Sequence, residues 1–167
     1  AGDAFVLDLG CGPGLVTIEM AQTVGERGRV VGVDREADAV ATARALLDEA
    51  GLPHVDVRRA EAWSTGLEPG AFDVVVANPP YITVKDKTLN ASYRELYPTC
   101  KGTYALTVPF MERFFDLAKR RDGDHPTGWT GQITSNSFMK REFGSRLIEE
   151  FLAKQDLRLV VDTSGAY

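Results

Sequence analysis

The sequence predicts an α/β fold built on a doubly wound, mostly parallel sheet. Short apolar runs alternate with helix-like segments along most of the chain, an order typical of parallel strands joined by crossover helices. The run Phe72–Asn78 has an unbroken apolar centre, as expected of a strand that is buried on both faces. With 167 residues and 44% apolar side chains, the chain is long enough for one domain with a hydrophobic core.

Six strands are expected from the apolar runs. The first of them, Ala4–Gly10, is rich in strand-forming residues and stops at a glycine. The other five expected strands are Arg29–Asp34, His54–Ala60, Phe72–Asn78, Trp129–Ser135 and Leu157–Thr163. A sheet of this kind is expected to lack its last strand here, because the chain ends soon after the sixth run.

Apolar residues at helical spacing predict four helices between these strands. Two of them close on a glycine, which is a frequent C-terminal signal. The expected helices are Leu15–Gly25, Arg35–Gly51, about Tyr104–Arg121, and Arg141–Gln155. The polar residues 82–103 are expected to form a long loop, and loops of that length are often functional.

Composition excludes several classes of protein. Two cysteines are too few for a disulfide framework, so we expect a reducing cytoplasm. No apolar run reaches the length of a membrane span, no signal-peptide pattern opens the chain, and the two histidines lack metal-ligand spacing. The net charge of −5 is uneven: residues 1–77 carry 13 acidic and 6 basic side chains, and residues 78–167 carry 11 and 13. The second half suits a polyanion better than the first, although ordinary solvated charge explains both halves.

A glycine-rich loop follows the first expected strand, in the stretch Asp8–Gly14 (DLGCGPG). Glycines there let the backbone turn sharply and let a ligand approach closely. A dinucleotide loop, Gly-x-Gly-x-x-Gly, needs a glycine at the position of Leu15, so the pattern disfavours a dehydrogenase. Asp34 ends the second expected strand, where a carboxylate can accept the hydroxyl hydrogens of a ribose.

The loop resembles motif I of the class I S-adenosylmethionine-dependent methyltransferases. This resemblance implies a Rossmann-like fold and S-adenosylmethionine as cofactor, with the loop around the methionine end, Asp34 at the ribose and Glu61 near the adenine amino group. A surface glutamate explains Glu61 nearly as well. The cofactor-binding residues that the resemblance implies are Asp8, Gly10, Gly12, Gly14, Asp34 and Glu61.

The stretch Asn78–Tyr81 (NPPY) ends the fourth expected strand. Ligands of open α/β sheets bind beyond the carboxyl ends of the strands, so this stretch should face the glycine loop. A conjugated amino nitrogen becomes nucleophilic when its N–H groups are accepted by an amide oxygen and a rigid backbone carbonyl. Asn78 and Pro79 supply these two acceptors, Pro80 stiffens the turn, and Tyr81 offers a flat face for stacking.

This stretch resembles motif IV of the amino-methyltransferases that act on adenine in DNA, on some RNAs or on protein glutamine. Residues from about Asn78 to Tyr167 resemble the adenine-specific enzymes of restriction-modification systems, most closely those of phage-growth-limitation and phage-exclusion systems. The first half resembles a generic small methyltransferase, which leaves a mosaic or engineered origin open. In the adenine-specific enzymes aromatic side chains hold the extruded base; the resemblance implies Tyr81, Tyr167 and Phe138 for this role, and core packing also explains Phe138.

We therefore expect a single catalytic domain over residues 1–167, with a cofactor half (1–77) and a substrate half (78–167). Its expected activity is methyl transfer from S-adenosylmethionine to adenine N6 in DNA, with no metal and with DNA bound through a recognition domain outside this segment. Two alternatives stay open. One is the same chemistry on protein glutamine or RNA, and the other is a truncated module that binds cofactor without turnover.

Overall fold

The computed structural model describes residues 3–123 and 126–163. The chain divides into two compact units. The first comprises Ala1–Asn78 and Arg113–Ile133, and the second comprises Pro79–Glu112 and Thr134–Tyr167. The first unit therefore contains the predicted cofactor loop together with a segment from the second half of the sequence.

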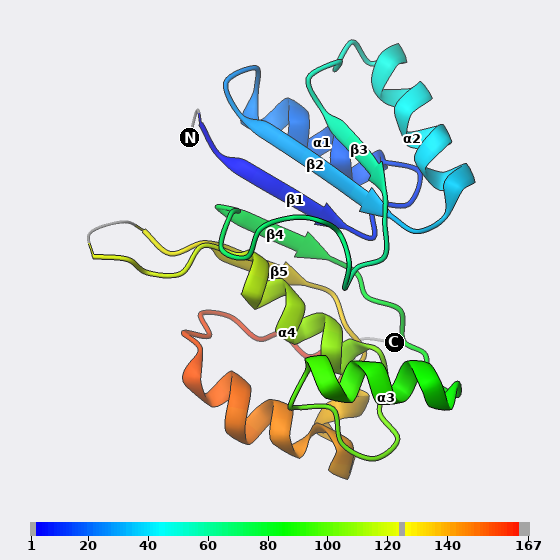
Figure 1. The fold of residues 1–167 in the computed structure, drawn as a ribbon. Coiled ribbons are helices and arrows are strands. Elements are labelled where there is room, and N and C mark those ends of the chain that lie inside the picture. The colour runs from blue at the N-terminus through cyan, green and yellow to red at the C-terminus, as the bar shows by residue number, and fades with distance from the viewer. Residues whose placement is uncertain (1–2, 124–125, 164–167) are drawn as a thin grey trace. The chain divides into compact units, whose positions relative to one another are not determined.

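The first unit is built on a five-stranded parallel sheet in the order β3-β2-β1-β4-β5 (Figure 1). Leu9 at the end of β1 pairs with Val33 of β2 on one side and with Ala77 of β4 on the other. The strand order reverses between β1 and β4, which is where open α/β sheets bind ligands. The predicted α/β class with a parallel sheet is confirmed. The strands are β1 (Phe5–Leu9), β2 (Arg29–Asp34), β3 (Asp56–Arg59), β4 (Val74–Ala77) and β5 (Trp129–Gln132).

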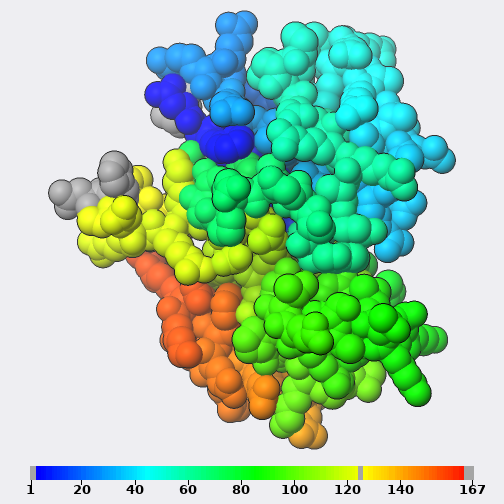
Figure 2. Space-filling view, viewed as in Figure 1, coloured from blue at the N-terminus to red at the C-terminus, as the bar shows by residue number. Residues whose placement is uncertain are grey.

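Two helices cover one face of this sheet. Helix α1 (Leu15–Val24) packs through Ala21 against β1 and β2, and helix α2 (Ala37–Glu49) packs against β3. Their small inward side chains let the helices approach the strands closely. The opposite face of α2 is exposed, and its cyan atoms are visible at the surface in Figure 2.

Helix α4 (Thr107–Leu117) is shorter than the predicted helix Tyr104–Arg121. It buries Phe114 and Leu117 completely. After Leu117 the backbone leaves the helix to pair with the residue Phe72: Ala118 forms a parallel bridge with it, and the N–H of Lys119 donates to its carbonyl at 2.8 Å. The pairing with the chain just before β4 therefore ends the helix early.

Residues 82–103, which we expected to form a loop, contain helix α3 (Lys87–Leu96). The carboxylate of Asp86 accepts a hydrogen bond from the N–H of Leu89 at 2.8 Å, so the helix has a side-chain N-cap. Tyr93 is its buried residue. Its apolar residues Leu89, Tyr93 and Leu96 recur at helical spacing after an N-cap residue, so the pattern indicates a helix and the prediction of a loop was wrong.

The C-terminal part of the second unit also departs from the prediction. The expected α-helix Arg141–Gln155 is present as an unbroken helical run over residues 142–154 of mixed type: 3-10 at Glu142–Gly144, π at Leu147–Phe151 and 3-10 at Leu152–Lys154. A further 3-10 turn, Asn136–Met139, precedes them. No helix in the described part of the chain is long and apolar enough to cross a membrane.

The prediction of a sixth strand over Leu157–Thr163 is wrong. These residues form no strand in the structure, and the side chains of Leu159, Val160 and Val161 are 81%, 68% and 68% exposed. β-Branched residues fit a pleated sheet, but a strand also needs a hydrogen-bonded neighbour. Within the described residues this segment pairs with none of the five strands.

Asp73 ties together the end of the sheet opposite the glycine loop. Its carboxylate accepts the N–H of Phe5 at 2.8 Å and the ammonium group of Lys119 at 2.7 Å. Partial burial opposes ionisation, but the bonds from Lys119 and Phe5 outweigh it and lower the pKa of Asp73 below its ordinary value of 3.8. The charged carboxylate therefore stabilises the fold above about pH 4, and this contribution is lost as the pH falls through the lowered pKa.

We expect Asp73→Ala to lower the free energy of unfolding by about 1–2 kcal/mol at pH 7. Asp73→Asn keeps an acceptor for the Phe5 N–H and loses only a solvent-screened ion pair, so about 0.5 kcal/mol is expected. Urea unfolding of both variants between pH 2 and pH 7 measures this. The difference between wild type and Asp73→Asn should shrink below about pH 4; a difference independent of pH would contradict the role of the carboxylate.

Candidate active site

The glycine loop lies between the carboxyl ends of β2 and β4. It begins directly after Leu9, whose paired residues Val33 and Ala77 immediately precede Asp34 and Asn78. Neighbouring strands lie about 4.8 Å apart, so these two polar side chains flank the start of the loop. The sheet thus places the start of the glycine loop, Asp34 and Asn78 at the same edge, although Gly10 and Asn78 are 68 residues apart in the sequence.

Backbone hydrogen bonds fix the loop. The N–H groups of Gly10 and Cys11 donate to the carbonyl of Val33 at 2.7 and 3.0 Å. Gly10, Gly12 and Gly14 have φ angles of 85°, 53° and 85°, in the left-handed region that favours glycine. A Cβ built on Gly10 or Gly12 meets no atom within 4 Å, so the loop backbone borders open space. A cofactor can approach the backbone here at contact distance.

Asp34 holds the loop through its carboxylate. Its Oδ2 accepts the N–H of Gly12 at 2.9 Å, and its Oδ1 accepts the N–H of Glu36 at 2.9 Å. A carboxylate has about four acceptor sites, so two such bonds leave capacity for further donors. Asp34 is half-buried, and its donor-accepting chemistry fits the hydroxyl groups of a ribose.

Asp8 is buried beneath the loop and accepts the hydroxyl of Thr17 on α1 at 2.7 Å. Burial raises the pKa of Asp8; the Thr17 hydrogen bond opposes this, and the charge of Asp34 adds to it. Asp8 therefore joins β1 to the first turns of α1 from below the loop. Sequence reasoning missed Thr17, which no motif distinguishes from any other helical threonine.

Cys11 lies within the loop and is buried. Burial, together with the negative charges of Asp8 and Asp34, raises the pKa of its thiol to about 12. The thiol is therefore protonated at neutral pH, so Cys11 acts as a small packing residue and not as a nucleophile.

Glu61 follows β3 at the same edge of the sheet. The N–H of Ala60 donates to the carbonyl of Asp34 at 2.9 Å, which places the residues after β3 beside the end of β2. Glu61 itself is half-buried and forms a backbone bridge with Ser64. The position is compatible with the contact to an adenine amino group that the resemblance implies.

The stretch Asn78–Tyr81 follows β4 without an intervening residue. Asn78 is exposed and belongs to the first unit, whereas Pro79, Pro80 and Tyr81 open the second unit. Pro79 is buried and Pro80 is exposed; Tyr81 is 51% exposed. Beyond it the N–H of Leu106 donates to the carbonyl of Ile82 at 2.9 Å and fixes the end of the stretch.

The two weaker aromatic predictions have different outcomes. Phe138 is buried, 7% exposed, in the 3-10 turn Asn136–Met139. This burial agrees with packing of Phe138 in the core and leaves its ring little surface for stacking. Tyr167 lies outside the described residues. Among the described residues, no group of three or more histidine, cysteine, aspartate or glutamate side chains could hold a metal ion.

The chain has a Rossmann-like fold of the class I methyltransferase type, which binds a nucleoside cofactor. Four features define it: the parallel sheet, the point where its strand order reverses, the open glycine loop and a carboxylate at the end of β2. The methyltransferase-domain family model matches residues 6–102, more than half of the chain, and the chain belongs to this family. S-adenosylmethionine is the cofactor of the class, and the open loop and Asp34 fit it.

Known relatives that match the chain are methyltransferases of several kinds. The adenine-specific methyltransferase PglX of Streptomyces coelicolor is 64% identical over 103 residues, which are 60% of this chain and 8% of that protein. The demethylmenaquinone methyltransferase of Lactococcus lactis is 31% identical over 87% of this chain and 59% of that protein. A release factor glutamine methyltransferase of Shewanella oneidensis is 31% identical over 76% of this chain and 43% of that protein. The chain thus spans less than two thirds of each of these relatives.

Solved structures show the same fold at low sequence identity. TrmN from Thermus thermophilus has a TM-score of 0.58 and 22% identity, with 81% of this chain and 34% of that chain covered. A SAM-dependent methyltransferase from Aquifex aeolicus has a TM-score of 0.50 and 20% identity, with 75% and 62% covered.

Proposed function

We propose that this chain transfers a methyl group from S-adenosylmethionine to the N6 amino group of adenine in DNA. The observation that carries the proposal is the position of Asn78, directly after the strand whose last residue pairs with Leu9 at the start of the cofactor loop. The 64% identity to an adenine-specific methyltransferase over 103 residues supports adenine as the acceptor.

In the proposed mechanism the protein prepares the acceptor nitrogen and holds it in line with the methyl group. The cofactor supplies an electrophilic methyl group when it is bound. The amide oxygen of Asn78 and the backbone carbonyl of Pro79 accept the two N–H groups of the amine, which favours the pyramidal nitrogen of the transition state. Tyr81 stacks on the base, and proximity and orientation supply much of the acceleration. Attack is direct, with no covalent intermediate on the protein, and the proton that the nitrogen loses as the N–C bond forms passes to solvent.

The same chemistry on protein glutamine or RNA is the second candidate. Similarity to a release factor glutamine methyltransferase and, at 35% identity over 53% of the chain, to an rRNA N(6)-adenosine-methyltransferase of Danio rerio supports it. A carboxamide and an adenine both offer a planar conjugated amino group, so Asn78 and Pro79 suit each of them.

Labelled methyl transfer to duplex DNA, to structured RNA and to a glutamine-containing peptide separates these candidates. We expect incorporation into DNA, recovered as N6-methyladenine after digestion. Incorporation only into RNA or only into the peptide would show that this molecule, and not DNA, is the methyl acceptor. Cofactor binding without transfer to any acceptor would instead favour a cofactor-binding module without turnover.

A further inference from the structure

We propose that Arg113 is a positioning residue for the cofactor, because it holds the segment 61–67 that borders the cofactor's adenosine end. This inference rests on the proposed function for the place of Glu61 near the adenine. Arg113 lies on α4 and belongs to none of the sequence motifs described above. Its side chain is only 13% exposed.

The segment 61–67 begins beside Asp34, the carboxylate expected to bind the ribose. Arg59, the last residue of β3, pairs with Asp34, and the next residue donates its N–H to the Asp34 carbonyl. From there the chain makes the turn Glu61–Ser64, closed by a hydrogen bond of 2.9 Å from the N–H of Ser64 to the carbonyl of Glu61. Any shift of this turn moves Glu61 relative to Asp34.

Thr65 follows the turn and has hydrogen bonds of its own. Beyond the turn, the Thr65 hydroxyl accepts the N–H of Leu67 at 3.1 Å. Thr65 is buried, 6% exposed, although it belongs to no helix or strand. Its hydroxyl oxygen can accept a second hydrogen bond, and it has such a partner on another element.

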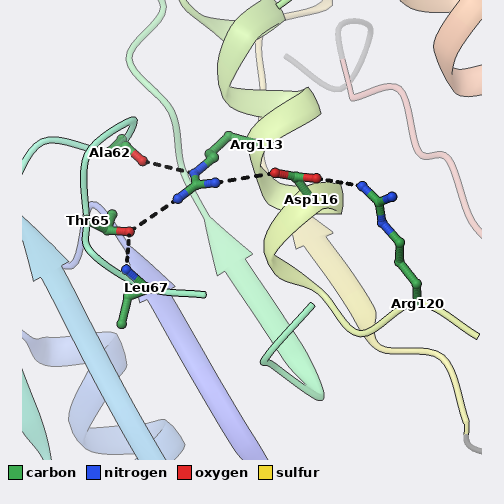
Figure 3. Close-up of polar contacts among 6 residues, drawn as sticks. All are labelled: Ala62, Thr65, Leu67, Arg113, Asp116 and Arg120. Atoms are coloured by element: carbon green, nitrogen blue, oxygen red, sulfur yellow. Dashed lines mark hydrogen bonds and ion pairs between the residues drawn. The ribbon is translucent and has the colours of Figure 1, made fainter. Parts of the chain in front are cut away.

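Arg113 is that partner (Figure 3). Its Nε donates to the carbonyl of Ala62 at 3.4 Å and its Nη2 donates to the Thr65 hydroxyl at 3.3 Å, so one rigid guanidinium plane spans the turn. Its Nη1 pairs with Asp116 at 3.3 Å, one turn further along α4. Asp116 also pairs with Arg120 at 2.6 Å, but Arg120 does not contact the segment in Figure 3 and its side chain is 76% exposed.

Two substitutions form a matched pair. Arg113→Met removes the contacts to Ala62 and Thr65, whereas Arg120→Met removes the other partner of Asp116 and leaves the segment in place. We expect Arg113→Met to weaken binding of S-adenosylhomocysteine, measured by calorimetry, by about tenfold, with Arg120→Met close to wild type. Arg113→Lys keeps the charge but cannot reach both acceptors at once, so it should fall between the two.

The kinetic signature separates positioning from a general loss of structure. For Arg113→Met we expect a higher KM for S-adenosylmethionine with kcat at saturating cofactor near wild type. In a Glu61→Gln background the same substitution should cost much less affinity, because its effect passes through Glu61. If Arg113→Met proves too unstable to assay, Thr65→Val breaks one of the same contacts and should raise the KM for the same reason.

Equal affinity of Arg113→Met and Arg120→Met for S-adenosylhomocysteine would overturn the role of Arg113, and so would an undiminished loss in the Glu61→Gln background. Neither outcome bears on the methyl acceptor. Failure of wild type to methylate DNA would overturn the proposed function, and the binding comparison would still decide the role of Arg113.

Discussion

Replacing Asn78 by alanine should reduce methyl transfer by about 10²–10³-fold, since one preorganised acceptor at the reacting nitrogen is lost. Cofactor binding should stay near wild type, because hydrogen bonds to Val33 and Asp34 fix the loop. Asn78 is exposed at the end of β4, so the fold should be retained. Single-turnover transfer of a labelled methyl group to DNA, with calorimetry of S-adenosylhomocysteine binding, measures both quantities.

Asn78→Asp is the matched variant for this experiment. It retains the shape of the side chain and an oxygen that can accept an N–H, so it should keep more activity than Asn78→Ala. Wild-type activity in Asn78→Ala would refute the proposed mechanism. Parallel loss of cofactor affinity and transfer would place the residue in cofactor binding instead.

Alanine substitutions at Gly12 and Gly14 should both have large effects, Gly14→Ala mainly on stability and Gly12→Ala mainly on cofactor affinity. A Cβ on Gly14 would lie 2.8 Å from the Cβ and 3.2 Å from the Cα of Ala43 on α2, at a φ of 85°. Backbone strain and overpacking together should cost about 2–4 kcal/mol of unfolding free energy. This is a large part of the total stability of a small domain.

The Cβ of Gly12→Ala meets no atom of the protein within 4 Å, so only its φ of 53° opposes the substitution. We expect a stability loss of about 1–2 kcal/mol but a fall in cofactor affinity of at least about tenfold, since the added methyl group occupies the space that the ligand needs. Thermal unfolding and calorimetry measure the two effects.

Gly51→Ala is the control for backbone strain alone. Its φ is 69°, its Cβ also meets nothing within 4 Å, and it lies just beyond the C-terminal end of α2, away from the loop. It should match Gly12→Ala in stability and wild type in cofactor binding. If both variants bind cofactor equally well, the open space at Gly12 is not the cofactor site.

The three central strands could be predicted because β1, β2 and β4 are apolar runs with a clear stop. Arg29–Asp34 was placed with its observed bounds, and the runs at Ala4–Gly10 and Phe72–Asn78 differ from β1 and β4 only at their ends. The loop and Asp34 followed from glycine spacing and strand position. These features are local in the sequence, and local patterns are what a sequence displays most directly.

The errors arise where structure depends on partners distant in the chain. Leu157–Thr163 has strand-forming residues but, among the described residues, no ladder with the five strands. The error at α3 is of another kind, because its cap and its apolar spacing are both local. Arg113 could not be identified, because its contacts lie 51 and 48 residues earlier, at a carbonyl and a hydroxyl that no motif marks.

The two hydrogen bonds that Asp34 accepts from Gly12 and Glu36 have a consequence for inhibitor design. These bonds are internal to the protein, so they fix the loop conformation without a ligand. Binding therefore costs little conformational entropy of the loop. A rigid nucleoside analogue shaped to this loop therefore competes for a preformed receptor. Stiffening such an analogue should improve its affinity nearly in proportion to the internal freedom that it gives up.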